Sequence, residues 1–265
     1  MSASRPRARP FVVGELLLVA FLLFGYDRIA SVANGHAREA LRHAWALWNA
    51  ERFVHIGIEL PVNHVLAAHR LLGQVLSVYY DFAHGFVTFG VLLSIYVFRA
   101  QLYRPARSAL MLINAVALAI FLLLPVAPPR LLTGSGFVDV VAGSGTWGSW
   151  EAGNSTISEH ADKFASVPSL HVAWALWVLR AAFASSSSRV LRTLASGHLA
   201  LTVAVVIATG NHYVLDVAAG AAVAEAAWWT ARGASLSVGA LRRLSAADRR
   251  RTALTPGMAE RQAAD

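Results

Sequence analysis

The stretch G-N-H-Y-V-L-D-V-A-A-G, residues 210–220, places a histidine and an aspartate at the start of an otherwise apolar segment. His212 and Asp216 are four residues apart, so they share one face of any helix that begins here. Ionisable side chains are costly in hydrocarbon, and membrane helices carry them chiefly where they serve a function. The pair therefore predicts a polar site at one end of a membrane helix.

The composition of the whole chain is that of a polytopic membrane protein. Of its 265 residues, 56% are hydrophobic and only 14% are charged, whereas soluble domains carry about a quarter charged residues. The absence of cysteine excludes disulfides, thiolate metal sites and cysteine nucleophiles. The net charge of +8 comes from arginines that flank the apolar segments, so we expect a membrane setting and no nucleic-acid partner.

Six apolar segments are predicted to cross the membrane, each close to the roughly 20 residues that a span requires. They are residues 11–33, 72–98, 108–127, 167–184, 190–209 and 213–231. Between the first two, residues 36–66 mix apolar and charged side chains at helical spacing, which predicts an interfacial helix. We expect an all-α, six-transmembrane-helix bundle with this additional interfacial helix.

The distribution of arginines predicts the orientation of the bundle. With six spans, the clusters before the first span, after the second and fourth, and after the sixth fall on one side, which the positive-inside rule makes cytoplasmic. Residues 34–70 depart from the rule, with four arginines on the other side. We predict a cell-membrane protein with both termini cytoplasmic and an external glycine- and serine-rich loop at 133–158 that is a candidate lid. Four regions are expected: 1–10, a cytoplasmic N-terminus; 11–70, the first span and interfacial helix; 71–232, the membrane core; and 233–265, a basic, disordered cytoplasmic tail.

On this topology, three distant segments deliver polar groups to the outer side of the membrane. Arg130 follows the third span, Ser169 and His171 begin the fourth, and His212 with Asp216 begins the sixth. Asp216 can accept from one ring nitrogen of His212 and leave the other basic, the orienting role that a carboxylate plays beside a catalytic histidine. His171 supplies a second proton-transfer group.

The remaining groups suit an anion. Arg130 can hold a phosphate in a bidentate way, and the start of the fourth span offers free N–H groups beside the Ser169 hydroxyl. We add Asn211, next to His212, and Lys163 as candidate phosphate-binding residues. The set predicts phosphoryl transfer with no metal and no other cofactor; the histidines between residues 36 and 69 lack a convincing ligand set with acids nearby.

The segment S-V-P-S-L-H-V-A-W-A (166–175), followed later by residues 210–220, resembles the type 2 phosphatidic acid phosphatase (PAP2) superfamily. The likeness is greatest to its inositol phosphorylceramide synthase-like branch, which P-V-A-P-P-R-L-L and G-F-V-D within 125–139 also fit, as does Y-Y-D-F-A-H (79–84) more loosely. The resemblance covers residues 75–225. It implies a six-helix membrane fold with an extracytoplasmic active site, a PAP2-like core at 71–232, and a metal-independent enzyme.

The resemblance also implies roles for individual residues. His212 would carry a phosphohistidine intermediate, Asp216 would orient it, His171 would act as the general acid, and Ser169 would bind phosphate. In two places the chain departs from the phosphatase pattern: only Arg130 matches the cations of the first motif, and Val206 stands where the third motif has an arginine. These departures favour the transferase-like branch, with Lys163 as one candidate replacement for a missing cation.

The predicted function is that of an integral membrane lipid phosphatase or phosphotransferase that acts on lipid-linked phosphate, with transfer of a phospho-head group to a polyol such as inositol as one form. Its partners would be a phospholipid or polyprenyl phosphate substrate and membrane lipids. One alternative is a polyprenyl (di)phosphate phosphatase of cell-envelope synthesis. Another is a non-enzymatic lipid-binding or transport protein, in which the histidine–aspartate pair locks helices together and Arg130 reaches the headgroups.

Overall fold

The computed structural model describes residues 36–145 and 164–254, together with residues 11, 13–15 and 17 near the N-terminus. For residues 238–254 it describes the backbone alone. Most of the predicted first span, the segment 146–158 of the predicted external loop, and Lys163 lie outside these residues.

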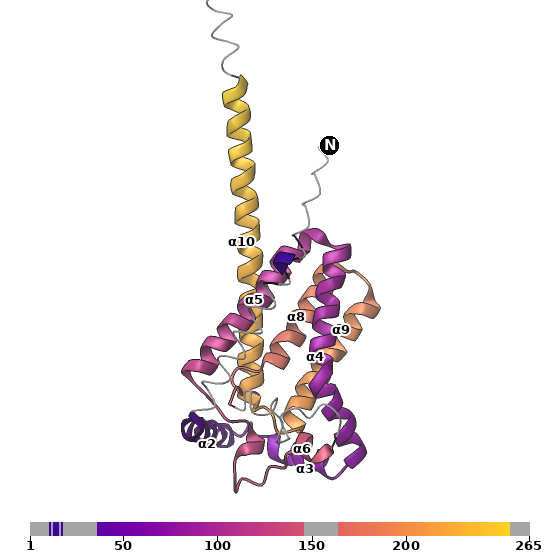
Figure 1. Ribbon diagram of the computed structural model, residues 1–265, viewed down its shortest axis with the longest axis vertical. Helices are drawn as coiled ribbons and strands as arrows, with labels where there is room; N and C mark the ends of the chain where they lie inside the picture. The colour runs from indigo at the N-terminus through magenta and orange to yellow at the C-terminus, as the bar shows by residue number, and fades with distance from the viewer. Residues whose placement is uncertain (1–10, 12, 16, 18–35, 146–163, 255–265) are drawn as a thin grey trace, which may run out of the picture.

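The regular structure of the described residues is helical, which confirms the all-α prediction (Figure 1). In chain order the helices are α2 (Ala37–Phe53), α3 (Glu59–Ala67), α4 (Arg70–Phe98), α5 (Ala100–Leu123), the short 3-10 helix η2 (Pro129–Leu131), α6 (Val140–Ser144), α8 (Leu170–Ser185), α9 (Arg189–Ala208) and α10 (Val214–Leu254). Extended backbone within the described ranges pairs at one isolated parallel bridge, between Val126 and Ala165.

Helix α8 is the central element of the bundle, because it packs against α4, α5, α9 and α10 (Figure 1). Fully buried alanines such as Ala106, Ala173 and Ala181 line these contacts, and small residues let helix backbones approach closely. Trp177 of α8 is also buried, and its Nε1–H donates to the carbonyl of Ala106 at 2.8 Å. The centre of the bundle is thus packed with small residues and with one tryptophan whose indole N–H is hydrogen-bonded.

Three helices of the described chain, α4, α5 and α9, are long and apolar enough to cross a membrane. Helix α8 is equally apolar but has only 16 residues. Large side chains such as Leu71, Phe86, Leu93 and Phe98 are exposed on α4, as expected where lipid rather than water surrounds a helix. The chain is therefore a multi-pass membrane protein.

Two helices extend beyond their predicted bounds. Helix α5 begins at Ala100, directly after Arg99, whereas the predicted span began at residue 108. Hydropathy alone excluded its first turns because they carry Arg104 and Arg107, but charged residues do not end a helix. Helix α10 continues from the predicted sixth span to Leu254 without interruption, so no helix end marks the predicted start of a disordered tail at residue 233.

The predicted interfacial helix is two helices, α2 and α3, joined by residues 54–58. The break follows from the backbone of His55, which has a φ of 61° and so cannot continue a right-handed helix. Both α2 and α3 lie at one end of the bundle, where α6 packs beside α3 (Figure 1). Their position brings them to the loops from which α8 and α10 start.

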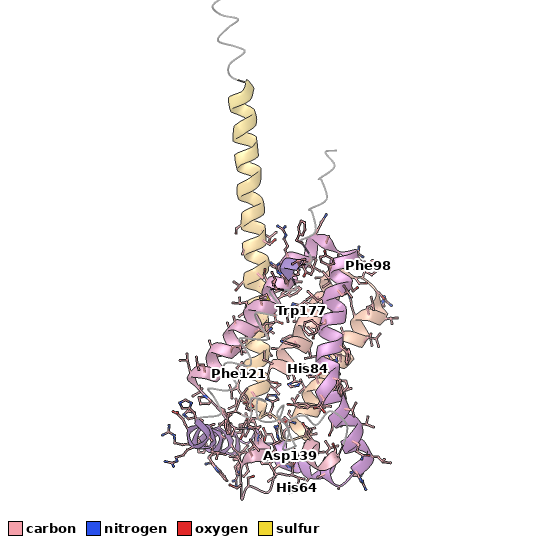
Figure 2. All side chains as sticks on the ribbon, viewed as in Figure 1. His64, His84, Phe98, Phe121, Asp139 and Trp177 are labelled. Atoms are coloured by element: carbon pink, nitrogen blue, oxygen red, sulfur yellow. The ribbon has the colours of Figure 1, made fainter. Side chains whose placement is uncertain are left out.

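This end of the molecule holds an unusual number of buried polar side chains. Figure 2 shows His64 and Asp139 at this end, Trp177 in the middle of the bundle, and Phe98 at the opposite end. The buried polar residues gathered here are Glu51, Glu59, Asn63, Ser166, Ser169, Asn211, His212 and Asp216. Because buried polar groups are costly unless they are bonded, their contacts identify the candidate site.

Candidate active site

His212 and Asp216 stand where α9 gives way to α10, and both are buried, at 4% and 0% exposure. Their separation in sequence was expected to bring them together, and the distance from His212 Nδ1 to Asp216 Oδ2 is 3.4 Å. Asp216 lies in the first turn of α10, where the helix dipole favours a carboxylate. The same Oδ2 accepts the backbone N–H of Tyr213 at 3.0 Å, so the carboxylate is fixed to the backbone that carries the histidine.

A second acceptor decides which ring nitrogen of His212 is free. Nδ1 lies 3.0 Å from the carbonyl oxygen of Ser166, and a carbonyl can only accept, so Nδ1 must carry the proton. The lone pair of the neutral ring is therefore on Nε2. His212 is held in the tautomer that a histidine nucleophile needs.

Ser166 is a residue of this site that the sequence analysis did not single out. Its carbonyl accepts from His212, and its hydroxyl donates a very short hydrogen bond to Asp216 Oδ2. Ser166 thus connects the chain before α8 to both members of the pair on α10. Ser166 is the first serine of the quoted stretch S-V-P-S-L-H, in which functions were predicted only for the second serine and the histidine.

Ser169 is the N-cap residue of α8. Its Oγ accepts from Val172 N at 3.4 Å, and its own N–H donates to the carbonyl of Asp216 at 3.1 Å. The start of α8 therefore touches the first turn of α10 directly. Gly220 makes this approach possible, since a Cβ at that position would lie 2.3 Å from the Ser169 carbonyl oxygen.

His171 lies in the first turn of α8 and faces the nucleophile. Its ring centroid is 5.8 Å from that of His212, and the side chain is partly exposed. The ring stacks on Tyr80 at 4.4 Å and meets the edge of His84 at 4.3 Å. The structure thus brings together the two histidines that the sequence analysis paired, on separate helices.

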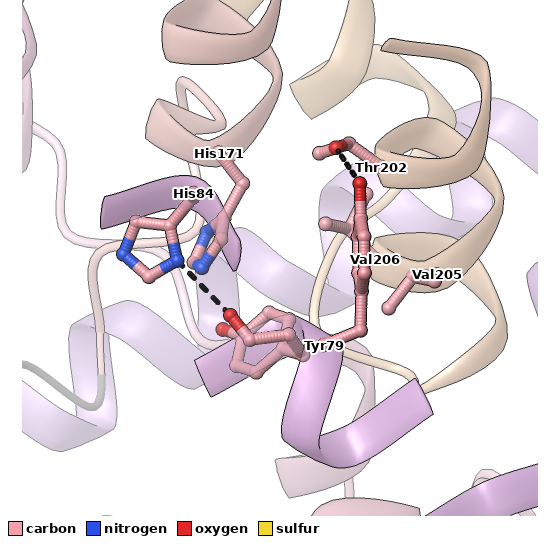
Figure 3. Close-up of a pocket in the computed structure, with 7 residues that line it drawn as sticks. Tyr79, His84, His171, Thr202, Val205 and Val206 are labelled. Atoms are coloured by element: carbon pink, nitrogen blue, oxygen red, sulfur yellow. Dashed lines mark hydrogen bonds between the residues drawn. The ribbon is translucent and has the colours of Figure 1, made fainter. Parts of the chain in front are cut away.

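His84 of α4 belongs to the same neighbourhood. Figure 3 shows the pocket beside His171, with His84 next to it and Tyr79 hydrogen-bonded to Thr202 on the opposite wall. The remaining lining residues are Tyr80, Val205 and Val206. His84 Nδ1 is 3.0 Å from the carbonyl of Tyr80, so this ring is also fixed with a proton on Nδ1. The sequence had linked Y-Y-D-F-A-H to the family only loosely; the structure places its last residue against His171.

Arg130 is anchored at the site by its backbone. Its N–H donates to the Gly210 carbonyl at 2.9 Å, which places the arginine beside the loop that carries His212. Its guanidinium is nearly buried, and Nε lies 3.3 Å from Asp139 Oδ2. Asp139 also caps α6 through Ala142 N at 2.9 Å. The predicted anion-binding arginine is thus held by an acid from the loop that was expected to lie over the site.

The other candidate phosphate-binding residues have different positions. Asn211 is buried and donates from Nδ2 to Thr209 Oγ1 at 2.8 Å, while its Oδ1 has no hydrogen-bond partner. Lys163 lies outside the described residues. Val206 is buried, and its carbonyl accepts the N–H groups of Asn211 and His212, each at 3.1 Å. Val206, which stands where the family has an arginine, therefore holds the backbone of the nucleophile and of the residue before it.

No group of three or more metal-ligating side chains occurs among the residues that the structure describes. The chemistry available from the described residues is that of two facing histidines, an orienting carboxylate, one arginine and the N-terminus of α8. This set matches the needs of acyl or phosphoryl transfer through a histidine nucleophile.

A family model described as the PAP2 superfamily matches residues 45–230. The chain belongs to the PAP2 superfamily. The match includes every candidate site residue described above and starts within α2, so it extends N-terminal of the predicted core boundary at residue 71. At the level that this match supports, the chain is a multi-pass membrane phosphatase of the PAP2 type.

Among solved structures, the crystal structure of LpxE from Aquifex aeolicus is similar to this PAP2 chain. The two share 18% sequence identity with a TM-score of 0.49, and the alignment covers 66% of this chain and 93% of that one. No curated protein is significantly similar to the chain in sequence.

Proposed function

We propose that the chain is a PAP2-type enzyme that transfers phosphate from a lipid-linked donor through a phosphohistidine on His212. The observation that carries the proposal is the fixed tautomer of this residue. The Ser166 carbonyl and Asp216 accept from the Nδ1–H of His212, and the ring of His171 lies 5.8 Å away at the start of another helix. A nucleophile that faces a proton-transfer group on another helix is what in-line displacement at phosphorus requires.

The proposed reaction has two steps that balance. In the first, Nε2 of His212 attacks phosphorus, the bond from phosphorus to the departing alcohol breaks, and His171 gives its proton to that oxygen. The departing alcohol is the lipid when free phosphate is the product, and the original head group when the product is a new phospho-polyol lipid. In the second, His171 takes a proton from the acceptor hydroxyl, whose oxygen attacks phosphorus and releases His212. Arg130 and the N–H groups at the start of α8, beside Ser169, would hold the phosphate oxygens, with Asn211 and Lys163 as further candidates.

The proposed setting is the extracytoplasmic face of the cell membrane. Helices α4, α5 and α9 supply three spans, and we assign the others to α8, the first part of α10 and the segment before α2. Both termini are then cytoplasmic, by the arginine distribution. The end of the bundle that holds His212 faces outward, and the substrate phosphate is that of a phospholipid or polyprenyl phosphate in the outer leaflet.

The acceptor is either water, as in a phosphatase, or a polyol such as inositol, as in a head-group transferase. The departures from the phosphatase motifs, chiefly Val206 in place of an arginine, are the ground for keeping a transferase beside the phosphatase. The test therefore measures both products.

The test is product analysis by mass spectrometry. Purified protein in detergent is mixed with phospholipids and polyprenyl phosphates, with and without inositol, and with EDTA throughout. Free phosphate from one donor establishes a hydrolase, and a new phospho-polyol lipid without free phosphate establishes a transferase. Acid-labile phosphate on His212, detected by trapping, is expected in both cases. No product with any donor, in the wild type and in His212→Ala alike, would overturn the proposal in favour of a lipid-binding protein.

A further inference from the structure

Two buried glutamates lie on the far side of the nucleophile, outside the machinery assigned above. Glu51, near the end of α2, and Glu59, at the start of α3, are both 0% exposed. The sequence analysis counted both as part of an interfacial helix. Fully buried acids are rare unless they are paired, and among the described residues no arginine or histidine forms a salt bridge with either one.

What these acids bind is the start of α10. Glu59 Oε1 accepts the N–H of Val214 at 2.9 Å, and Glu51 Oε1 accepts the N–H of Leu215 at 2.6 Å. The first N–H groups of a helix have no partner within it, and here two of them are bonded by side chains from distant helices. Asp216 is the next residue along. The first turn of α10, which carries the orienting carboxylate, is thus clamped from outside.

The other oxygen of each carboxyl group, Oε2, is buried and accepts from no N–H or hydroxyl group, so the two neighbouring acids can bond each other only by sharing a proton. Burial first, then the hydrogen bond with Glu59 and the negative charges of Glu59 and Asp216, together raise the pKa of Glu51 to about 9, although the Leu215 N–H opposes the shift. The ionisable groups around Glu51 are Glu59 from α3, and Asp216 and Tyr213 from the start of α10. All of them are acidic, so at neutral pH the pair keeps one proton between two carboxyl groups.

We propose that Glu51 and Glu59 are positioning residues for the nucleophile: one shared proton holds them together, and the joined pair fixes the first turn of α10 so that Asp216 and His212 keep their geometry. The proposal rests on the proposed function for its consequence in catalysis. Loss of the shared proton sets two adjacent buried charges against each other and against Asp216. The clamp then loosens, and a displaced nucleophile reacts slowly.

The decisive variant is Glu51→Gln. Its amide keeps an oxygen for Leu215 N–H and offers an N–H to Glu59, so it copies the protonated pair but cannot lose the proton. Glu51→Ala removes the clamp at all pH values. Glu39→Gln is the matched control: it makes the same change on the same helix, but Glu39 is exposed and pairs only with surface groups of α2, Arg42 and His43.

The first measurement is kcat and KM from pH 6 to pH 10 on the donor found by product analysis. We expect kcat of the wild type and of Glu39→Gln to fall as the pH passes about 9, and kcat of Glu51→Gln to keep its neutral value there. Glu51→Ala should lose roughly 100-fold in kcat at neutral pH with little change in KM, the loss typical of a displaced catalytic group. An alkaline fall that persists unchanged in Glu51→Gln, or an unimpaired Glu51→Ala, overturns the proposal.

The second measurement needs no activity. A carboxyl whose pKa is higher in the folded than in the unfolded state binds more protons when folded, so stability falls as the pH rises between the two values. For Glu51 this window runs from 4.5 to about 9. The Tm of the wild type should therefore fall across it more steeply than that of Glu51→Gln. Parallel curves would overturn the shared proton, whereas a wild type without turnover but with the expected Tm difference would overturn the proposed function and leave the acid pair established.

Discussion

The polar end of the bundle consists of two regions, and their functions differ in how far the sequence predicts them. The starts of α8 and α10 carry histidine, serine and aspartate at short spacings, so their chemistry is legible in the sequence. Helices α2 and α3 carry Glu51, Glu59 and Asn63 at spacings that match no motif, yet each is fully buried beneath the site. Residues that react often lie at short spacings in the sequence, so a motif can reveal them. Residues that support them are recognised only from their contacts in the folded structure.

The largest effect is expected from removal of the nucleophile in the first region. His212→Ala leaves the pair of Asp216 and Ser166 without a ring to orient, and kcat should fall by about 10⁴-fold or more, as for other covalent catalytic residues. His69→Ala is the control, because His69 is exposed and its Nδ1 bonds only the Val65 carbonyl. Phosphate release or transfer is the measurement. Activity retained in His212→Ala would place the chemistry elsewhere.

A contact within the first region should have the next largest effect. Gly220→Ala would place a Cβ 2.3 Å from the Ser169 carbonyl oxygen, a backbone atom that cannot move without shifting the start of α8. We expect a loss of about 1–3 kcal/mol in unfolding free energy, seen as a lower Tm, together with reduced kcat. Gly197→Ala on α9 meets no atom within 4 Å and should be neutral or slightly stabilising. Equal Tm values for the two variants would contradict this contact.

The sequence predicted the fold and the first region better than it predicted the second. The helical class, the starts of α8 and α10, and the meeting of His171, His212 and Asp216 were all predicted, because apolar runs and i, i+4 pairs are local properties. Ser166 was missed because its role depends on a backbone carbonyl as well as a hydroxyl. The start of α5 was misplaced because hydropathy reads Arg104 and Arg107 as a boundary, although Arg107 pairs with Glu15.

The supporting region could not have been predicted in the same way. A glutamate on an amphipathic segment reads as a solvated charge, and only the fold brings Glu51 and Glu59 to the first turn of α10. The break at His55 had no clear signal either, since the left-handed conformation is uncommon for residues other than glycine. The hydrogen bonds of Glu51 and Glu59 join residues more than 150 positions apart along the chain, which no local pattern reveals.

Asn63 tests whether the second region stabilises the site without taking part in the reaction. Its Nδ2 donates to the carbonyls of Val138 and Ala208, each at 3.0 Å, and its Oδ1 accepts from Val138 N at 2.8 Å. Asn63→Ala leaves these buried groups unpaired and should cost about 1–3 kcal/mol of unfolding free energy, while kcat at temperatures below the transition falls only severalfold. Asn49→Ala, on the exposed face of α2, should change neither. A full loss of kcat with unchanged Tm would make Asn63 part of the reacting machinery and break the division between the two regions.

The smallest effect should come from substitution of His84. This residue belongs to neither region, because its helix, α4, carries no strong motif, yet its ring contacts His171. Asn is the informative substitution, since its amide N–H can still donate to the Tyr80 carbonyl that His84 Nδ1 contacts at 3.0 Å. We expect His84→Asn to lower kcat by about tenfold or less, through loss of the edge contact that orients the His171 ring, an aromatic pair worth about 0.5–1.5 kcal/mol. His198→Asn is the control, because its ring lies across the pocket against Tyr79 rather than against His171. Rapid-quench measurement of phosphoenzyme formation and decay would separate the two steps. A loss in His84→Asn equal to that in His171→Ala would show that His84 itself transfers the proton, and α4 would then join the reacting region.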